Sequence, residues 1–133
     1  EAYERGEWAE ADVRPYISDM VTEFEKANLV ICRAGATTCA ELAAAGRPSI
    51  MVPLPTAADD HQRKNAEAMA AAGAAKMILQ SDLRGEGLAA EIRELMAEPQ
   101  MLVEMSIAAK KLGRRDAAAA AVQLIEELAQ KNV

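Results

Sequence analysis

Large aromatic side chains are scarce in this sequence, which has one tryptophan, two tyrosines and one phenylalanine among 133 residues. A core must therefore be built from leucine, isoleucine, valine and methionine, between alanine-rich helices that pack closely. No apolar run approaches the roughly 20 residues that span a bilayer, and no signal-peptide pattern is present. These absences predict a soluble, cytoplasmic chain with one domain at most.

The sequence also has few cysteine and histidine residues that could bind a metal, and fewer basic than acidic residues. Cys32, Cys39 and the single histidine, His61, cannot supply the four ligands of a structural zinc site. We therefore interpret both cysteines as plain buried thiols and expect no metal site. Lysine and arginine number 15 against 21 aspartates and glutamates, and this net charge of -6 argues against a nucleic-acid partner.

Short apolar runs alternate with helical stretches through the first two thirds of the chain. The runs predict strands at 11–17, 29–32, 48–54 and 76–79. Helices are expected at 18–27 with Ser18 as N-cap, at 39–45 before Gly46, and at 61–72 before Gly73. The rest is purely helical, with helices predicted at 88–97, 99–112 and 116–130. This order predicts an α/β fold with a parallel sheet covered on both faces.

Ligands of such sheets bind outside the carboxyl ends of the strands. Three junctions lie at those ends, at residues 16–19, 33–41 and 54–65. The sequence also begins at Glu1, without an initiator methionine, in a charged stretch of helical composition (residues 1–10). We therefore expect a piece of a longer protein.

The turn 35–38 lies between a predicted strand and a predicted helix. Its amide groups are expected to point outward at the positive end of the helix dipole, with hydroxyls from Thr37 and Thr38 as further donors to a phosphate. Glu41 lies one helical turn further on the same face, where a carboxylate is able to accept both ribose hydroxyls. The alternatives are an ordinary capped turn and a favourable charge in the first turn of the helix.

His61, Gln62 and Asn65 begin the helix after the third junction, and His61 and Asn65 share a face. Such uncharged donors and acceptors suit the hydroxyls of a sugar. We rank this role for His61 above that of a catalytic base, and a surface histidine is the third interpretation.

The only basic cluster, at residues 110, 111, 114 and 115, surrounds Gly113, where a helix is predicted to end. Compensation of that helix's dipole explains it. The seven methionines are dispersed and are interpreted as core filling.

Taken in order, these segments resemble the carboxyl-terminal domain of the MurG family, the bacterial peptidoglycan UDP-N-acetylglucosamine transferases. The resemblance rests on YISDM at 16–20, CRAGATT at 32–38 with Glu41, VPLP at 52–55, HQRKNA at 61–66 and AGAA at 72–75. It covers the chain from about Val13 onward, and the ordered combination is more specific than any single motif.

The resemblance implies a partial Rossmann-like domain of the GT-B type, with about four parallel strands, helices on both faces and a helical carboxyl-terminal tail. Residues 1–133 are then the half that binds UDP-N-acetylglucosamine, and the amino-terminal acceptor domain is absent. The implied reaction is an inverting, metal-independent transfer of N-acetylglucosamine to an undecaprenyl-linked acceptor, lipid I, without a cofactor. Its place is the cytoplasmic face of the inner membrane, with peripheral membrane contact through the missing domain.

The resemblance also assigns roles to residues of this sequence. They are the backbone of Ile17 on uracil with Tyr16 alongside, Gly35, Ala36, Thr37 and Thr38 near the pyrophosphate, Glu41 on the ribose, and His61, Gln62 and Asn65 around the sugar. Arg33 fits the pattern without an assigned role, and pairing with an acidic neighbour is one explanation. No residue is a convincing catalytic base, so the base is expected in the missing domain and the chain alone is expected to be inactive.

Two other functions fit the same residues. One is a different GT-B glycosyltransferase or a separate donor-binding subunit, although the spacing of His61, Gln62 and Asn65 favours the bacterial enzyme. The other is a non-catalytic module that binds a nucleotide sugar. An isolated chain with an open sheet edge is further expected to associate with itself through that edge.

Overall fold

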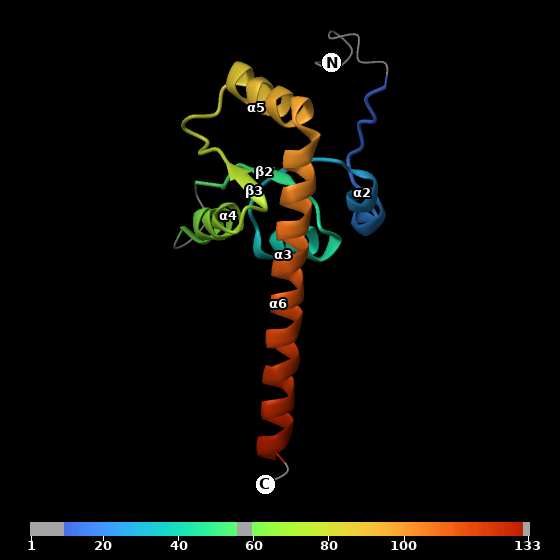
Figure 1. The fold of residues 1–133 in the computed structure, drawn as a ribbon, viewed down its shortest axis with the longest axis vertical. Helices are drawn as coiled ribbons and strands as arrows, with labels where there is room; N and C mark the ends of the chain where they lie inside the picture. The colour runs from blue at the N-terminus through green and yellow to red at the C-terminus, as the bar shows by residue number, and fades with distance from the viewer. Residues whose placement is uncertain (1–9, 56–59, 132–133) are drawn as a thin grey trace.

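The computed structural model describes residues 10–55 and 60–131. The charged stretch expected to be helical at residues 1–10 lies almost entirely outside this range. Along the chain the elements are α2 (Met20–Lys26), β1 (Val30–Cys32), α3 (Ala36–Ala45), β2 (Ser49–Met51), α4 (His61–Ala71), β3 (Ala75–Met77), α5 (Gly85–Ala97) and α6 (Pro99–Lys131) (Figure 1).

The described strands form one parallel sheet in the order β1-β2-β3. The register aligns Val30 with Ser49 and Ser49 with Ala75. This confirms the predicted α/β class and three of the four strands. The strand expected at 11–17 was wrong, because this segment pairs with none of the described strands and leaves Val13 69% and Tyr16 80% exposed. Pro15 at its centre offers no N–H to a neighbouring strand.

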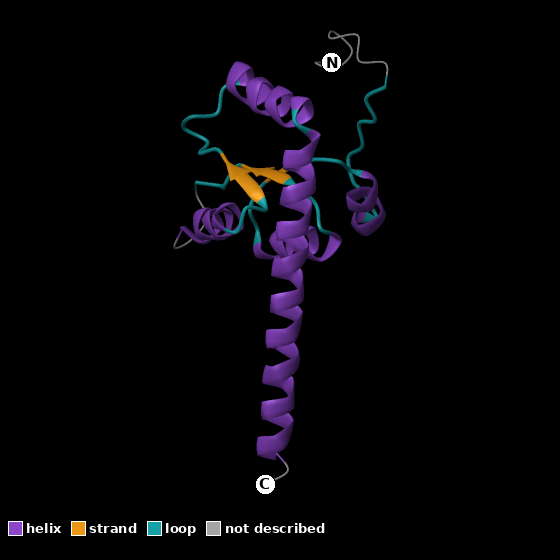
Figure 2. Ribbon diagram, viewed as in Figure 1, coloured by secondary structure: helices purple, strands orange, loops and turns teal. Residues whose placement is uncertain are grey.

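Side chains of β2 point alternately to the two faces of the sheet, and each face has its own core. Met51 packs with Leu42 of α3 and with Ala66 and Met69 of α4. On the other face, Ile50 packs with Leu95 of α5 and Met105 of α6. Helices therefore cover both faces, as predicted (Figure 2).

Two glycines end helices where the sequence predicts it. Gly46 caps α3 in the left-handed conformation at a φ of 63°, and the N–H groups of Gly46 and Arg47 bond back to Ala43 and Leu42. Gly73 follows the cap of α4 at a φ of 82°. At the start of α2 the predicted cap Ser18 was wrong. Asp19 takes that place, because its carboxylate accepts the N–H and the hydroxyl of Thr22, and these bonds lower its pKa.

The carboxyl-terminal region is one helix of 33 residues, α6, and not the two helices predicted. Gly113 does not end it, because its backbone keeps a negative φ and the helix passes so close to α3 that an added Cβ would lie 2.8 Å from the carbonyl oxygen of Ala43. The glycine permits close packing here, and the alanine run that follows continues the helix. The final part of α6 extends beyond the other described elements (Figure 1).

Contacts of α6 lie at the amino-terminal ends of the strands. The Ser106 hydroxyl donates to the carbonyl of Gly46 at 2.7 Å, just before β2, and the helix also lines a groove with Asn28 and Pro48, which precede β1 and β2. The loops that follow β1, β2 and β3 lie at the opposite, carboxyl edge of the sheet. Despite its length, α6 lacks the apolar character needed to cross a membrane, and so does every other helix in the described ranges.

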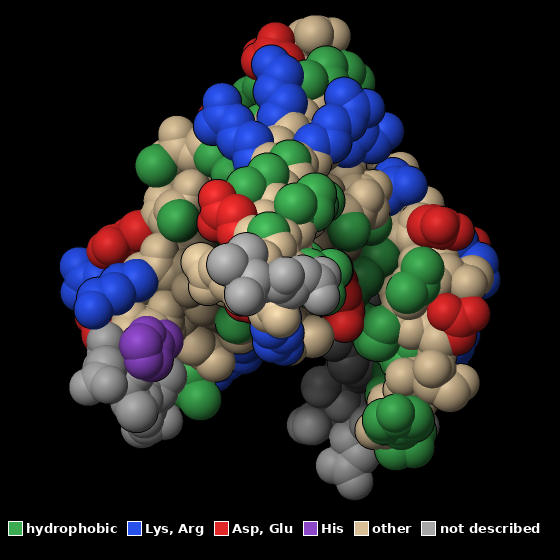
Figure 3. All heavy atoms as spheres, turned by 90° about the horizontal axis from the view of Figure 1, so that it is seen from below, with side chains coloured by type: hydrophobic (Ala, Val, Ile, Leu, Met, Phe, Trp, Pro, Cys, Tyr) green, Lys and Arg blue, Asp and Glu red, His purple; other side chains and the backbone are tan. Residues whose placement is uncertain are grey.

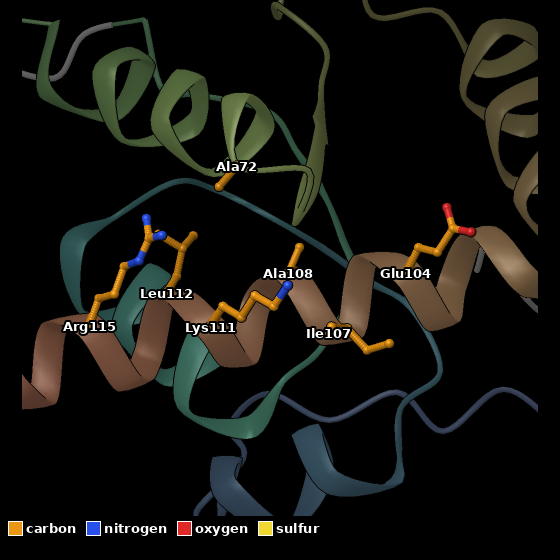
Figure 4. A pocket seen from close by; sticks show the side chains of 7 residues that line it. All are labelled: Ala72, Glu104, Ile107, Ala108, Lys111, Leu112 and Arg115. Carbon is orange, nitrogen blue, oxygen red and sulfur yellow. The ribbon is translucent and has the colours of Figure 1, made fainter.

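The basic cluster therefore lies in mid-helix, and its predicted place at a helix end was wrong. Lys110 instead packs its stem over Gly46, the cap of α3. Lys111 and Arg115 line a hollow of about 360 Å³ together with Ala72, the cap of α4 (Figure 4). Lysine and arginine side chains gather visibly on this part of the surface (Figure 3). The charges thus lie near the carbonyl ends of two other helices, α3 and α4, where a cation is stabilising.

Candidate functional site

The candidate site is the carboxyl edge of β1 and β2, on the side away from α6. The turn 33–35 connects β1 to α3, and the loop after β2 leads to α4. The two strands stay together one residue beyond the sheet, because the N–H of Val52 donates to the carbonyl of Cys32 at 2.9 Å. Both loops therefore start side by side.

The start of α3 has the form that an anion site requires. Its N-cap is Gly35, which has no side chain to cap the helix, and its first turn has no acidic residue. The first bond back into the turn runs from the N–H of Cys39 to Gly35, and the N–H groups of Ala36, Thr37 and Thr38 have no hydrogen-bond partner among the described residues. Nothing lies within 4 Å of a Cβ built on Gly35, so there is open space beside these donors. The turn therefore carries no side-chain cap, and its two interpretations, an anion site and an ordinary strand-to-helix turn, both stay predictions.

Glu41 is the sixth residue of α3 and lies beyond its first turn, so the predicted alternative of a first-turn charge is wrong. It follows Thr37 by four positions and Thr38 by three, which places the three side chains on one face of the helix. Glu41 is half-buried, and it forms no ion pair with any residue in the described ranges. Its carboxylate is thus available to a ligand at this end of α3.

Gln62 and Asn65 contact the turn from α4. The Oε1 atom of Gln62 accepts the N–H of Ala34 at 3.2 Å and the N–H of Leu54 at 2.9 Å. Asn65 donates through Nδ2 to the carbonyl of Ala34 at 3.0 Å. The structure therefore brings both residues to the predicted site, but it places their bonds on the protein backbone. The helical spacing already indicates this contact, since Gln62 and Asn65 continue the buried stripe of Ala66 and Met69 on α4.

Arg33 connects the same two loops from the other side. Its Nη1 atom lies 3.2 Å from the carbonyl oxygen of Val52 and 3.5 Å from that of Pro53. The predicted pairing with an acidic neighbour was wrong within the described residues, because the partners of Arg33 are carbonyl groups. Arg33 therefore ties the end of β1 to the end of β2.

His61 is exposed at the first position of α4, directly after Asp60, whose backbone has a left-handed φ of 57°. Tyr16 and Ile17 lie in the irregular segment before α2, where Ile17 is half-buried. The roles predicted for these three residues stay predictions. A further hollow of about 460 Å³ joins the loop after β2 to Gln80 and Ser81 after β3. The sequence interpretation passed over that junction, although the rule on carboxyl ends applies to it equally.

The two cysteines are free and half-buried. Burial raises the pKa of the Cys32 thiol to about 11 and also raises that of Cys39, so neither thiol is activated as a nucleophile. Within the described residues, no group of three or more histidine, cysteine, aspartate or glutamate side chains is placed to hold a metal ion.

Residues 2–121 match the family model for the glycosyltransferase family 28 C-terminal domain. The chain belongs to this family. A glycosyltransferase family 28 C-terminal domain has the GT-B architecture, and the parallel sheet between helices agrees with it, with three described strands where about four were predicted.

Curated relatives carry a more specific name. The chain is 48% identical over 120 residues to the "UDP-N-acetylglucosamine--N-acetylmuramyl-(pentapeptide) pyrophosphoryl-undecaprenol N-acetylglucosamine transferase" of Stutzerimonas stutzeri, a match that covers 90% of this chain and 34% of the relative. The protein of the same name from Geobacter metallireducens is 51% identical over 108 residues, 81% of this chain and 30% of the relative. This family 28 domain thus spans about a third of the length of these relatives.

Comparison with solved structures supports the same family. A crystal structure of Acinetobacter baumannii MurG matches with a TM-score of 0.72 and 42% identity, over 80% of this chain and 32% of that one. A second match, to the glycotransferase of kitacinnamycin, has a TM-score of 0.66 at 24% identity and supports the fold alone. The resemblance of this family 28 domain to MurG is therefore confirmed.

Proposed function

We propose that this family 28 domain binds UDP-N-acetylglucosamine and, as part of a longer protein, transfers N-acetylglucosamine to lipid I to form lipid II. The observation that carries the proposal is the uncapped start of α3, which offers three free N–H groups, with Glu41 about one helical turn further along the helix on the face of Thr37 and Thr38. Relatives of about 48% identity that are named for this transfer support the choice of donor and acceptor.

The chemistry of the donor fits these residues. In the transfer, the bond between the sugar and the diphosphate breaks, and negative charge develops on the departing UDP. The N–H groups of residues 35–38 and the dipole of α3 stabilise that charge without a metal ion. Glu41 accepts the ribose hydroxyls, Ile17 and Tyr16 hold the uracil, and His61 contacts the sugar.

The acceptor side of the reaction belongs, in this proposal, to a further domain. That domain supplies the catalytic base, binds the undecaprenyl-linked acceptor and makes peripheral contact with the cytoplasmic face of the membrane. The 133-residue chain alone is therefore expected to show no transfer of N-acetylglucosamine from donor to lipid I. Turnover by the purified chain would contradict this division of roles.

Calorimetry with UDP-N-acetylglucosamine tests the donor assignment directly. We expect saturable binding of UDP-N-acetylglucosamine and weaker binding of UDP, with no measurable binding of ADP as a control for nonspecific anion contact. Equal binding of ADP and UDP would leave only a general phosphate site and would reject the proposed donor. Binding of many UDP-sugars with equal affinity would favour a different GT-B enzyme.

His61 gives a more specific prediction. Its replacement in His61→Ala is expected to weaken binding of UDP-N-acetylglucosamine more than binding of UDP, because the side chain contacts the sugar and not the nucleotide. The two affinities are measured by the same calorimetry on wild type and variant. Equal losses for both ligands would remove His61 from the sugar subsite.

Self-association of the chain is a further expectation. In the described residues β1 pairs only with β2, and Ile31 of β1 is 46% exposed beside an apolar groove of about 840 Å³. Sedimentation of the purified chain is expected to show dimers that Ile31→Lys reduces, because an exposed apolar strand edge favours pairing and a lysine opposes it. Sedimentation of the chain as a monomer at all concentrations tested would contradict the predicted self-association.

A further inference from the structure

A hollow lies between the end of α4 and one face of α6, on the side of the sheet away from the candidate site (Figure 4). Its volume of about 360 Å³ is near the lower end of the range of about 300–1,000 Å³ in which proteins hold small molecules. The lining consists of the cap of α4 and a row of α6 residues spaced so that they share one face of the helix. These residues are Ala72 from α4, and Glu104, Ile107, Ala108, Lys111, Leu112 and Arg115 from α6.

The row on α6 combines apolar surface with charges of both signs. Ile107, which is 49% exposed, and Leu112, which is half-buried, line it with apolar surface. Lys111 and Arg115 lie one helical turn apart and place two positive charges toward one end of the row. Glu104 places a negative charge at the other end (Figure 4). From Ile107 to Arg115 the helix rises by about 12 Å, which leaves room for an apolar group beside a charged one.

The two cations of the hollow have no partner within the described structure. Neither Lys111 nor Arg115 forms an ion pair or a hydrogen bond with a described residue. The carbonyl of Ala70, in the last turn of α4, accepts the N–H of Gly73 and not a cation. The dipole of α4 therefore explains why positive charge is stabilising here, but it leaves the donor groups of both side chains available to a ligand.

We propose that this hollow binds an amphiphilic anion, whose acidic group lies between Lys111 and Arg115 and whose apolar body covers Ile107. Charge-assisted hydrogen bonds hold the acidic group, and removal of the exposed isoleucine surface from water holds the body. Glu104 repels the acidic group from the other end of the row and so fixes the orientation of the ligand. Because the whole chain has a net charge of -6, its overall field opposes anions, and binding depends on these two local cations.

Titration of the purified chain with octanoate, followed by amide NMR signals, tests the charged part of this site. Octanoate joins a carboxylate to an apolar chain, and we expect it to shift the signals of Ala72 and Ile107. Lys111→Ala and Arg115→Ala are each expected to weaken octanoate binding by about fivefold, as for the loss of an exposed ion pair. Lys131→Ala, which removes one charge from the exposed end of α6, is the matched control and is expected to leave binding unchanged.

Two further probes and one variant test the apolar part. Octanol lacks the charge and inorganic phosphate lacks the apolar chain, so each is expected to bind at least about fivefold more weakly than octanoate. Ile107→Ser is expected to weaken octanoate and octanol but not phosphate. Phosphate that binds as tightly as octanoate would leave only a general anion contact and would overturn the proposal. Charge variants that act no differently from Lys131→Ala would also overturn it, and the two cations would then only compensate the dipole of α4.

The candidate site is a second place where an acidic ligand can bind, and competition separates the two. Saturating octanoate is expected to leave the signals of Gly35 and Ala36 in place and to leave the affinity for UDP-N-acetylglucosamine unchanged. Displacement of UDP-N-acetylglucosamine by octanoate would put octanoate in the candidate site and would overturn the proposal. If Arg115→Ala does not fold, Arg115→Lys, which keeps the charge, is expected to retain octanoate binding, and Arg115→Gln is expected to lose it. Equal binding by these two variants would contradict a role for the charge.

Discussion

Replacement of Glu41 by alanine is expected to weaken binding of UDP-N-acetylglucosamine by about 1–3 kcal/mol, or about 5- to 150-fold in the dissociation constant. The carboxylate has no partner of its own among the described residues, and α3 places it on the face of Thr37 and Thr38. A ligand that gives it two ribose hydroxyls would lose both bonds in the variant. Calorimetry on wild type and variant measures the difference.

The control for Glu41 separates a local contact from a change in overall charge. Glu126→Ala removes one carboxylate from the exposed end of α6 and is expected to leave the affinity unchanged. A 2′-deoxy analogue of UDP sharpens the test, because it lacks one of the two hydroxyls and is expected to be less sensitive to the loss of Glu41. If Glu41→Ala binds UDP-N-acetylglucosamine as tightly as the wild type, Glu41 does not belong to the site.

The strands and helix stops of this fold were predictable because they depend on local features. The apolar runs that became β1, β2 and β3 are too short for helices and lie between alanine-rich stretches. Gly46 and Gly73 end helices because a left-handed residue at that position is almost always glycine. Each of these features is contained within about ten residues of sequence.

Gly113 was misinterpreted because its role is set by a distant part of the chain. A glycine between basic residues near the end of an apolar pattern looks like a helix stop in any single sequence. Only the packing of α6 against Ala43 of α3, 70 residues earlier, shows why no side chain fits there. The strand predicted at 11–17 was wrong for a similar reason. A strand needs a neighbouring strand to pair with, and no strand of the described sheet pairs with this segment.

The rule on carboxyl ends predicts which residues come together at the candidate site, but it does not predict the partners of Gln62 and Asn65. Their spacing predicts a shared face of α4 without saying what that face meets. The packing of Ala66 and Met69 against the sheet turns that face toward Ala34. The chemistry of a carboxamide suits a sugar and a peptide group equally, so the residue types alone were unable to decide.

The packing role of Gly113 leads to the largest stability effect that we expect. A Cβ at this position would lie 2.8 Å from the oxygen and 2.9 Å from the carbon of the Ala43 carbonyl, both backbone atoms that cannot rotate away. Gly113→Leu must therefore push α6 away from α3, and we expect a loss of about 3 kcal/mol in the free energy of unfolding. Urea denaturation followed by circular dichroism measures this loss.

Gly87 provides the matched control, because it is also a helical glycine but has nothing within 4 Å of an added Cβ. Gly87→Ala is expected to stabilise the protein by about 0.5–1 kcal/mol, since alanine restricts the unfolded chain and favours the helix. Gly113→Ala is expected to have the opposite sign despite the same gain in helix propensity. If Gly113→Ala stabilised the protein as Gly87→Ala does, α6 would not pass this close to Ala43 of α3, and the close packing of the two helices would be contradicted.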